Sequence, residues 1–379
     1  MTHRQLGLYI HWPYCAAICP YCDFNVYRAR GADTAPLVDA ILADLAYWRA
    51  QTGPRPLASL FFGGGTPSLM DPADVARVIE TADRLWGLEA SVEISLEANP
   101  TDAEAARFAD LRAAGVERLS LGVQALDDPS LKALGRFHSA AEAMAAADLA
   151  RQLFPRLSID LIYARQDQTL AAWQDELMRA LALNPDHVSP YQLTIEPGTA
   201  FARAAARGRL KVPDPDLAAD FYTLTQDVLE GAGFDAYEVS NHARGHDNRS
   251  RHNLLYWRSQ DWIGVGPGAH GRLGWGGERR ASKALDRPRD YVDQVTARGH
   301  AIDELETLSP EAVRDEFWLM GLRLQDGLPL ADAPRPALSD DKIRRNLEHG
   351  WMWQSDTHLG LTAQGRLLAD AVIGDLLAD

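Results

Sequence analysis

Three cysteines stand close together near the amino terminus, in the segment Cys15-Ala16-Ala17-Ile18-Cys19-Pro20-Tyr21-Cys22. They are the only cysteines of the chain, and thiols that merely fill space in a core are not expected to gather in this way. A disulfide would leave one thiol over and would close only a short loop. Three neighbouring thiolates favour a soft metal instead, either zinc with His11 or Asp23 as fourth ligand, or an iron–sulfur cluster with one open iron.

Other residues that could bind a ligand follow apolar segments along the first half of the chain. Gly63-Gly64-Gly65-Thr66-Pro67 lets the backbone approach a ligand closely, although the lysine of a P-loop is missing and a tight turn is the alternative. Carboxylates, an amide and a guanidinium can bind hydroxyl, ammonium or carboxylate groups, and such side chains occur at Glu97, Gln124, Arg136 and Asp160. Taken singly, each is more often a solvated or paired structural residue.

A repeating pattern of strands and helices is expected to position these residues. Apolar segments rich in β-forming residues predict strands over 6–11, 59–62, 91–96, 118–123, 157–163 and 187–193. Helical spacing predicts helices over 35–48, 72–86, 102–114, 139–153 and 170–183. This alternation indicates an α/β fold with a parallel sheet, and six units favour an incomplete (β/α)6 barrel over the doubly wound alternative. Ligand-binding residues should then lie at the carboxyl ends of the strands.

The pattern changes after about residue 200. A helix is expected over 216–229, followed by glycine- and aromatic-rich loops that include residues 264–271, and then by a helix over 311–324. The last part of the chain is typical of a small helical, winged-helix-like unit. We therefore predict a core barrel over 1–235, a connecting region over 236–305 and a carboxyl-terminal domain over 306–379.

The cysteine spacing, together with Tyr21 just before the last cysteine, resembles that of the radical S-adenosylmethionine (SAM) enzymes. The resemblance implies that Cys15, Cys19 and Cys22 bind a [4Fe-4S] cluster, that SAM fills the open iron position, and that an electron donor serves the cluster. It also implies a set of SAM contacts, which in this sequence are Tyr9, Tyr21, Gly64, Gly65, Thr66, Glu97, Gln124, Arg136 and Asp160.

Further segments resemble the branch of that family that is related to oxygen-independent coproporphyrinogen III oxidase. They are residues 191–199, 237–241 and 264–271. With them, the resemblance covers nearly the whole chain. The oxidases carry a fourth cysteine two residues after the third, where this chain has Phe24. Heme chaperones of the same branch lack that cysteine and carry His-Asn-x-x-Tyr-Trp, here residues 252–257. Both features favour a heme chaperone, with a radical enzyme of porphyrin biosynthesis as the alternative.

The resemblance implies that heme binds near His252 and passes to an acceptor protein, which could be a membrane-associated respiratory protein. His252 is the expected axial ligand and Tyr256 the second candidate, since both side chains can bind heme iron and would share one face of a helix. The alternative is that His252 is a hydrogen-bonded structural residue in a packed corner. Oxidase activity is not expected, cleavage of SAM is left open, and no catalytic residue is assigned.

One segment departs from the branch. Where its members usually have a Pro-Gly-Gln turn after the fifth strand, this chain reads Ala164-Arg165-Gln166-Asp167-Gln168-Thr169. Losing proline and glycine removes a fixed φ and a residue that tolerates positive φ, so the loop beside Asp160 can take another course.

Composition sets the remaining expectations. The net charge of −15 argues against nucleic acid or an anionic membrane surface as the main partner. The amino terminus shows no signal-peptide pattern, and no apolar run approaches the roughly 18 residues of a membrane span. With clustered, reduced thiols, these features predict a cytoplasmic protein.

Overall fold

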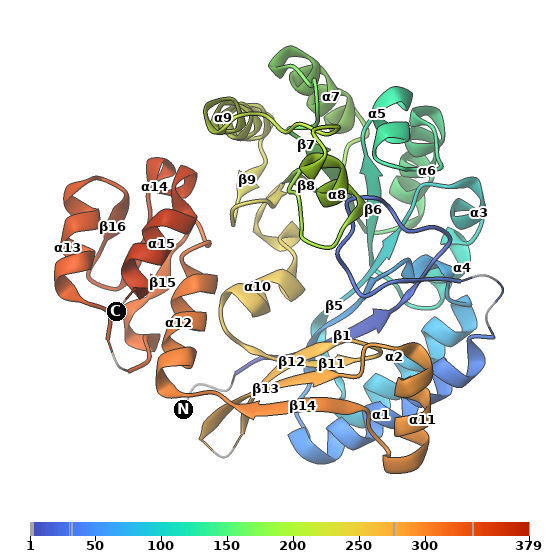
Figure 1. The fold of residues 1–379 in the computed structure, drawn as a ribbon. Coiled ribbons are helices and arrows are strands. Elements are labelled where there is room, and N and C mark those ends of the chain that lie inside the picture. Colours follow the sequence, from blue (N-terminus) through green and yellow to red (C-terminus); the bar gives the residue numbers. More distant parts are fainter. Residues whose placement is uncertain (1–3, 30, 32, 276, 336, 379) are drawn as a thin grey trace.

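A computed structural model of the chain describes residues 4–29, 31, 33–275, 277–335 and 337–378. Its centre is a curved sheet in which six parallel strands follow one another in chain order (Figure 1). They are β1 (Leu6–Trp12), β4 (Leu57–Gly64), β5 (Leu88–Ala98), β6 (Arg118–Gln124), β7 (Arg156–Tyr163) and β8 (His187–Gln192). The strand order never reverses within this set. The predicted incomplete barrel is therefore confirmed, and the doubly wound alternative is wrong.

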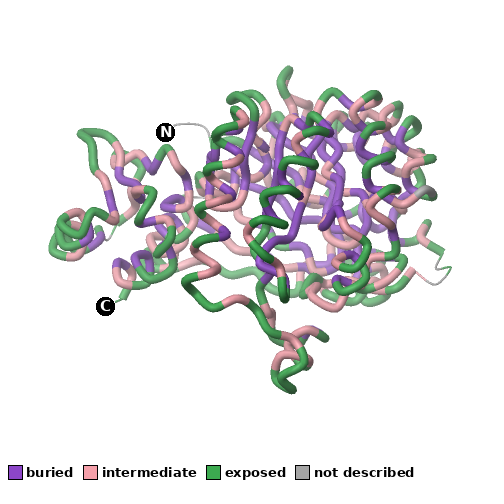
Figure 2. The backbone as a smooth tube through the Cα atoms, turned by 90° about the horizontal axis from the view of Figure 1, so that it is seen from above, coloured by how far each residue is buried: buried purple, intermediate pink, exposed green. Residues whose placement is uncertain are grey.

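Helices cover the outer face of the barrel, and their starts follow from capping residues. The larger ones are α1 (Ala35–Thr52), α2 (Pro72–Trp86), α6 (Ala140–Leu153), α7 (Leu170–Ala182) and α9 (Pro215–Gly231), with the shorter α5 (Asp128–Ala133). The short helix α8 (Ala200–Ala206) lies instead against the cysteine loop, where the Phe201 amide donates to the Pro20 carbonyl at 2.9 Å. Asp71 caps α2 by accepting a hydrogen bond from the Ala73 amide, and Ser139 with Glu142 forms a capping box at α6. Burial is concentrated in the strands and in the inner faces of these helices (Figure 2).

The helix predicted over 102–114 is divided into α3 (Asp102–Ala105) and α4 (Phe108–Ala113). The break lies where Glu104 turns inward, accepting hydrogen bonds from the Ser68 hydroxyl and from the Asn99 amide. Phe108 then starts a second helix that buries its own ring in the core. A polar contact of one side chain thus overrides the helical pattern.

Four further strands extend the sheet beyond β1. The strand β11 (Asp261–Val265) is parallel to β1, and β12 (His270–Trp275), β13 (Glu278–Ala284) and β14 (Ile302–Thr307) continue antiparallel, with α11 (Pro288–Arg298) between the last two. The expectation of loops over 264–271 was therefore wrong at both ends of that segment. Gly264 is needed because a Cβ there would collide with the backbone of His270, so this glycine marks a close approach of two strands.

The outer strands of the sheet differ in length and charge. Beyond β8 the sheet ends in two short strands, β10 (His242–Ala243) and β9 (Asp235–Ala236). At the other end lies β14, in which Asp303, Glu304, Leu305 and Glu306 are exposed. Among the described residues, no strand pairs with the outer edge of β14.

A second hydrophobic cluster belongs to a small carboxyl-terminal unit beside the barrel (Figure 1). It is built from α12 (Pro310–Gly321), α13 (Asp340–Glu348), α14 (Ala363–Leu367), α15 (Ala369–Leu377) and a sheet of β15 (Leu328–Pro329), β17 (His358–Leu361) and β16 (Met352–Gln354). This agrees with the expected small helical unit, while the boundaries at 235/236 and 305/306 stay predictions. The structure contains no helix long and apolar enough to cross a membrane within its described residues.

The helix α10 (Arg251–Trp257) lies between the barrel and this small unit (Figure 1). Leu254 and Trp257 pack into the carboxyl-terminal cluster. Leu255 and His252 lie on the barrel side, where a Cβ added at Gly7 would meet both side chains. One short helix thus contacts both parts of the molecule.

Candidate functional site

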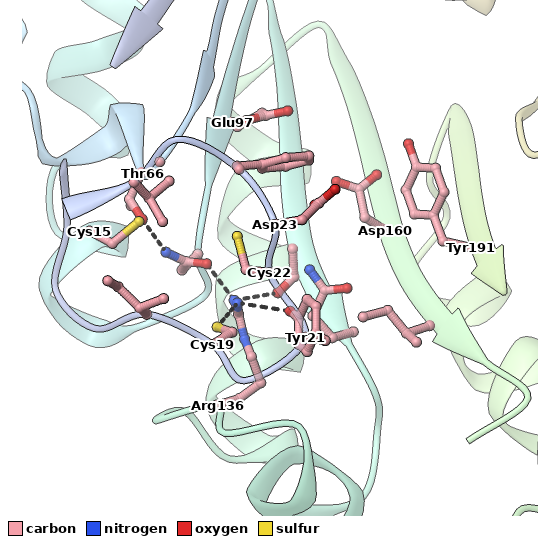
Figure 3. A pocket seen from close by; sticks show the side chains of 18 of the residues that line it. Cys15, Cys19, Tyr21, Cys22, Asp23, Thr66, Glu97, Arg136, Asp160 and Tyr191 are labelled. Atoms are coloured by element: carbon pink, nitrogen blue, oxygen red, sulfur yellow. Dashed lines mark hydrogen bonds between the residues drawn. The ribbon is translucent and has the colours of Figure 1, made fainter. Parts of the chain in front are cut away.

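A cavity of about 370 Å³ opens at the carboxyl ends of the barrel strands (Figure 3). Most of the residues predicted for the site line it, namely Cys15, Cys19, Tyr21, Cys22, Gly64, Gly65, Thr66, Glu97, Gln124, Arg136 and Asp160. The cysteines and Arg136 lie on one side, and Asp160 and Tyr191 lie on the opposite side (Figure 3). Tyr9, His252 and Tyr256 are outside the lining and are described below.

The cysteine loop is fixed to the barrel through backbone contacts. Its two ends form a small sheet of β2 (Tyr14–Cys15) and β3 (Tyr27–Arg28). The amides of Gly65 and Thr66 donate to the carbonyls of Trp12 and Tyr14, at 2.6 and 2.9 Å. A Cβ at Gly65 would lie 2.8 Å from both carbonyl oxygens, so a glycine is required for this close approach. The glycine-rich turn therefore positions the cysteine loop as well as lining the cavity.

Cys15, Cys19 and Cys22 line one side of the cavity. Among the residues that the structure describes, no three or more His, Cys, Asp and Glu side chains are grouped to hold one metal ion. His11 is also engaged, because its ring nitrogens bond the Tyr9 hydroxyl and the Asn25 carbonyl, both at 3.0 Å. In a four-iron cluster each thiolate binds a different iron, so the thiols need only surround a common space. Without metal, burial raises the pKa of the Cys15 thiol to about 11.

Arg136 is a fixed cation in the cavity wall. It follows Gly135, which has φ of 70° and packs so closely on Pro20 that a Cβ would lie 2.5 Å from the proline ring. Its guanidinium donates to the Gly122 carbonyl at 3.1 Å, to the side-chain oxygen of Asn99, and to Cys19 Sγ at 3.4 Å. These contacts aim a charged, planar donor at the space beside the cysteines, where a carboxylate would suit it.

Two carboxyl groups face the same cavity from β5 and β7. Glu97 accepts a hydrogen bond from the Gly64 amide at 3.1 Å, and Asp160 accepts one from the Ser120 hydroxyl at 2.9 Å. Burial, followed by the charge of Asp160, raises the pKa of Glu97 to about 8, and burial raises the pKa of Asp160 to about 6. A ligand with ammonium or hydroxyl groups would favour their ionised forms by donating hydrogen bonds to them.

Gln124 ends β6 in the left-handed region, with φ of 67°, where the pairing of β6 with β7 shifts by one residue. Its amide lies over Gly122, since a Cβ on that glycine would be 2.8 Å from Gln124 Nε2 and 3.5 Å from Arg136 Nη2. The unusual backbone therefore brings Gln124 and Arg136 together at one wall of the cavity. Left-handed backbone at a residue other than glycine is costly and needs support from its surroundings.

Tyr9 and His252 lie together in a buried aromatic layer. The ring of Tyr9 stacks on Phe61, with centroids 6.2 Å apart, and its hydroxyl bonds His11. His252 stacks on Phe61 at 4.8 Å and on Tyr9 at 6.0 Å. Tyr9 lies outside the cavity lining, which does not support direct contact with a cofactor. That contact therefore stays a prediction.

His252 and Tyr256 share one face of α10, which confirms the helical spacing expected for them. His252 Nε2 bonds the Tyr256 hydroxyl at 2.7 Å, and Nδ1 bonds the Ser59 hydroxyl at 2.9 Å. The residue is only 2% exposed, and burial lowers the pKa of the imidazole to about 3. Both ring nitrogens are thus engaged in this state, while Leu254 and Trp257 pack on the other side of the helix.

Sequence reasoning missed two residues that support the site. Asn99 donates to the Thr66 hydroxyl at 3.1 Å and accepts from Arg136, so it connects two predicted contacts. Glu104 in turn accepts from the Asn99 amide at 2.8 Å. The position of Asn99 at a strand end was an available signal, whereas Glu104 lies within a helical pattern that gives none.

Comparisons with known proteins agree with this geometry. The model of the radical SAM superfamily matches residues 9–178. The chain is 42% identical over 330 residues to radical S-adenosyl methionine domain-containing protein 1, mitochondrial, of Bos taurus, covering 86% of this chain and 74% of that one. It is 36% identical over 389 residues to heme chaperone HemW of Mycobacterium tuberculosis, covering 100% and 96%.

Among solved structures, coproporphyrinogen III oxidase (HemN) of Escherichia coli, a radical SAM enzyme, superposes with a TM-score of 0.80. The superposition covers 99% of this chain and 90% of that one at 23% identity. At that identity the likeness concerns the fold, and it includes the carboxyl-terminal unit as well as the barrel.

Proposed function

The chain belongs to the HemW family of radical SAM proteins, and on this basis we propose that it binds a [4Fe-4S] cluster, SAM and heme, and delivers heme to an acceptor protein. One observation carries the proposal for the cluster and SAM. Three cysteines, a fixed arginine, a glycine-rich turn and two carboxyl groups face one cavity of about 370 Å³ at the barrel mouth. A membrane-associated respiratory protein as acceptor and a reducing protein for the cluster are proposed partners.

Each group in the cavity has a proposed part in binding. Cys15, Cys19 and Cys22 would hold the cluster, which when bound supplies one-electron chemistry to SAM. Arg136 suits the carboxylate of SAM, and the backbone of the glycine-rich turn with Thr66 suits its amino group. Hydroxyl and ammonium groups would donate to Glu97, Gln124 and Asp160, and Tyr21 closes the wall beside Arg136.

Replacing Arg136 by alanine should weaken SAM binding by about 1.5–3 kcal/mol, the usual contribution of a hydrogen bond to a charged group. The measurement is equilibrium dialysis of SAM against anaerobically reconstituted protein, with iron content matched between samples. Lys132→Ala is the control, since Lys132 is an exposed cation in the short helix α5, which ends just before Arg136. If Arg136→Ala binds SAM as tightly as the wild type, Arg136 has no part in the cofactor site.

Heme binding near His252 is the second part of the proposal, and it is supported by residues 252–257 and by the family. In the present conformation Nε2 is bonded to Tyr256 and Nδ1 to Ser59. Ligation of heme iron would have to break one of these bonds and open α10 on one side. Heme binding at this position is therefore expected to be accompanied by a rearrangement of α10.

Heme titration should distinguish the candidate ligands. His252→Ala should lower heme affinity and shift the Soret band, whereas Tyr256→Phe should keep the ligand while releasing Nε2. His349→Ala, an exposed histidine of the small unit, serves as the control. An unchanged spectrum and affinity for His252→Ala would show that another residue binds the iron.

The same reconstituted samples should show no decarboxylation of coproporphyrinogen, because Phe24 stands where the oxidases carry another cysteine.

A further inference from the structure

The loop that replaces the Pro-Gly-Gln turn after β7 is closed by side chains. Ala164 and Asp167 have φ of 56° and 59°, a region that residues other than glycine rarely adopt. The Arg165 amide donates to Gln168 Oε1 at 3.2 Å, and the Gln168 amide donates to the Arg165 carbonyl at 3.1 Å. This closure turns the Arg165 side chain inward, beneath the ends of β6 and β7.

Arg165 forms a buried ion pair with Glu176 of α7. The two residues are 7% and 5% exposed, and Arg165 Nη2 lies 2.6 Å from Glu176 Oε2. Arg165 Nη1 approaches the other carboxylate oxygen at 3.4 Å, and Gln168 Nε2 donates to Glu176 Oε2 at 3.3 Å. A buried ion pair adds little stability compared with apolar residues of the same volume, so its contribution here is sought in the geometry that it fixes.

The geometry that the ion pair fixes is that of the irregular carboxyl end of β6. Glu176 Oε1 accepts a hydrogen bond from the Leu126 amide at 2.6 Å. Arg165 Nη1 donates to the Ile162 carbonyl at 2.6 Å and approaches the Gln124 carbonyl at 3.4 Å. The ion pair thus holds the Gln124 carbonyl, the Leu126 amide and the Ile162 carbonyl of β7, at the point where the ladder between β6 and β7 is interrupted.

Neighbouring side chains bond two further carbonyl groups of this segment. His138 Nε2 bonds the Val123 carbonyl at 3.1 Å, and Arg179 Nη1 donates to the Leu126 carbonyl at 2.9 Å. The Ala125 amide donates to the Val123 carbonyl at 2.8 Å and closes a tight turn at Gln124, while side chains bond the Gln124 and Leu126 carbonyls and the Leu126 amide. This support explains how Gln124 is kept in the left-handed region, with its amide over Gly122 and beside Arg136.

We propose that Arg165 and Glu176 are positioning residues for SAM binding, which fix the left-handed end of β6 and so aim Gln124 into the cofactor cavity. The proposal rests on the proposed binding of SAM at this cavity. Without the ion pair, residue 124 can relax to a negative φ, and its side chain then turns away from Arg136.

The test replaces both charged side chains by apolar ones, in the variant Arg165→Met/Glu176→Leu. The double replacement is made in the wild-type protein and in the Gln124→Ala variant, and each product is compared with its parent. SAM affinity is measured by equilibrium dialysis on anaerobically reconstituted protein with matched iron content, and the midpoint of thermal unfolding is measured on the same samples. We expect affinity to fall about two- to tenfold, the effect of losing one hydrogen bond. In the Gln124→Ala background the same replacement should change affinity less than twofold, while its effect on thermal unfolding persists.

A matched control is the ion pair of Arg151 and Asp186, where Asp186 likewise accepts a backbone hydrogen bond, from the Leu157 amide at 2.8 Å. Arg151→Met/Asp186→Leu should leave SAM affinity unchanged. Arg165→Lys keeps the charge but not the planar fork, so it serves as the test variant if the apolar pair fails to fold. An affinity loss of equal size in the Gln124→Ala background, or no loss at all, would overturn the proposal.

Amide hydrogen exchange of residues 123–127 provides a readout that does not depend on SAM. Faster exchange in the apolar pair variant, with unchanged exchange in β4, supports the fixing of this segment by the ion pair. Unchanged exchange at residues 123–127 overturns it. If the wild-type protein does not bind SAM, the proposed function fails, and the exchange measurement still decides whether the ion pair fixes the end of β6.

Discussion

Replacing Cys19 by serine should remove most of the iron from the reconstituted protein, together with its labile sulfide. Cys19 lies between the other two cysteines in sequence, and Arg136 Nη1 donates to its sulfur at 3.4 Å. A hydroxyl is a poor ligand for iron of a sulfide cluster, and the chain has no further cysteine to replace it. The loss should appear in iron and sulfide content and in the visible absorption of protein handled without oxygen.

Ala17→Ser is the control for this experiment, because it adds a hydroxyl to the same loop and leaves the three thiols in place. It should retain iron at the wild-type level. A wild-type protein that is colourless and carries one equivalent of zinc, lost on Cys19→Ser, would instead establish the single-metal site.

Replacing Glu93 by glutamine should lower the free energy of unfolding by about 3–5 kcal/mol, the usual effect of breaking a buried ion pair. Glu93 of β5 is completely buried, and its carboxylate accepts from Arg118 Nε at 3.0 Å and from Arg156 Nη1 at 3.2 Å. It also accepts from the amides of Arg251 and His252 at 3.0 and 3.3 Å, and so anchors the start of α10. Neutral glutamine would leave two guanidinium groups without their shared counter-charge.

Urea unfolding at several pH values tests this expectation. Burial opposes the charge of Glu93, but Arg118 and Arg156 outweigh this effect, so the pKa of Glu93 is lower in the folded protein than in the unfolded chain. The stability that ionised Glu93 contributes is therefore complete above the unfolded pKa of about 4.3, and it is lost as the pH falls through the pKa of Glu93 in the folded protein. Glu93→Gln should remove this part of the acid sensitivity.

Glu117→Gln is the matched control, because Glu117 pairs with the same Arg156 but its side chain is 38% exposed. Its expected effect is below about 1 kcal/mol. Equal losses for the two variants would show that burial of Glu93 is not what makes its ion pairs important.

The barrel could be predicted because local signals and tertiary structure agree. The helix over Pro72–Trp86 illustrates this, since its apolar spacing, its capping residue Asp71 and its final Gly87 all point to the same boundaries. The cysteine spacing likewise identified the centre of the site directly. Strands β11 to β14 were missed in part because Gly264 and Gly271 are typical of loops, and only the packed structure shows that they allow close strands.

The parts of the site that could not be predicted depend on partners distant in sequence. Asn99 joins Thr66 to Arg136, and neither partner can be read from the segment around Asn99. One hydrogen-bond partner of His252 is likewise distant in sequence, since Ser59 lies on strand β4, whereas Tyr256 follows in the same helix. Residue types can suggest a ligand, but whether a nitrogen is available depends on contacts that only the fold creates.

The acidic outer strand β14 has a consequence for self-association. An unpaired strand edge offers backbone donors and acceptors to a second copy of the same strand. Pairing of two such edges would bring Asp303, Glu304 and Glu306 of both copies together, and facing like charges disfavour a ladder by about 0.2–1 kcal/mol per pair. This repulsion disfavours edge-to-edge pairing at neutral pH, and it weakens when acid protonates the carboxylates or when salt screens them.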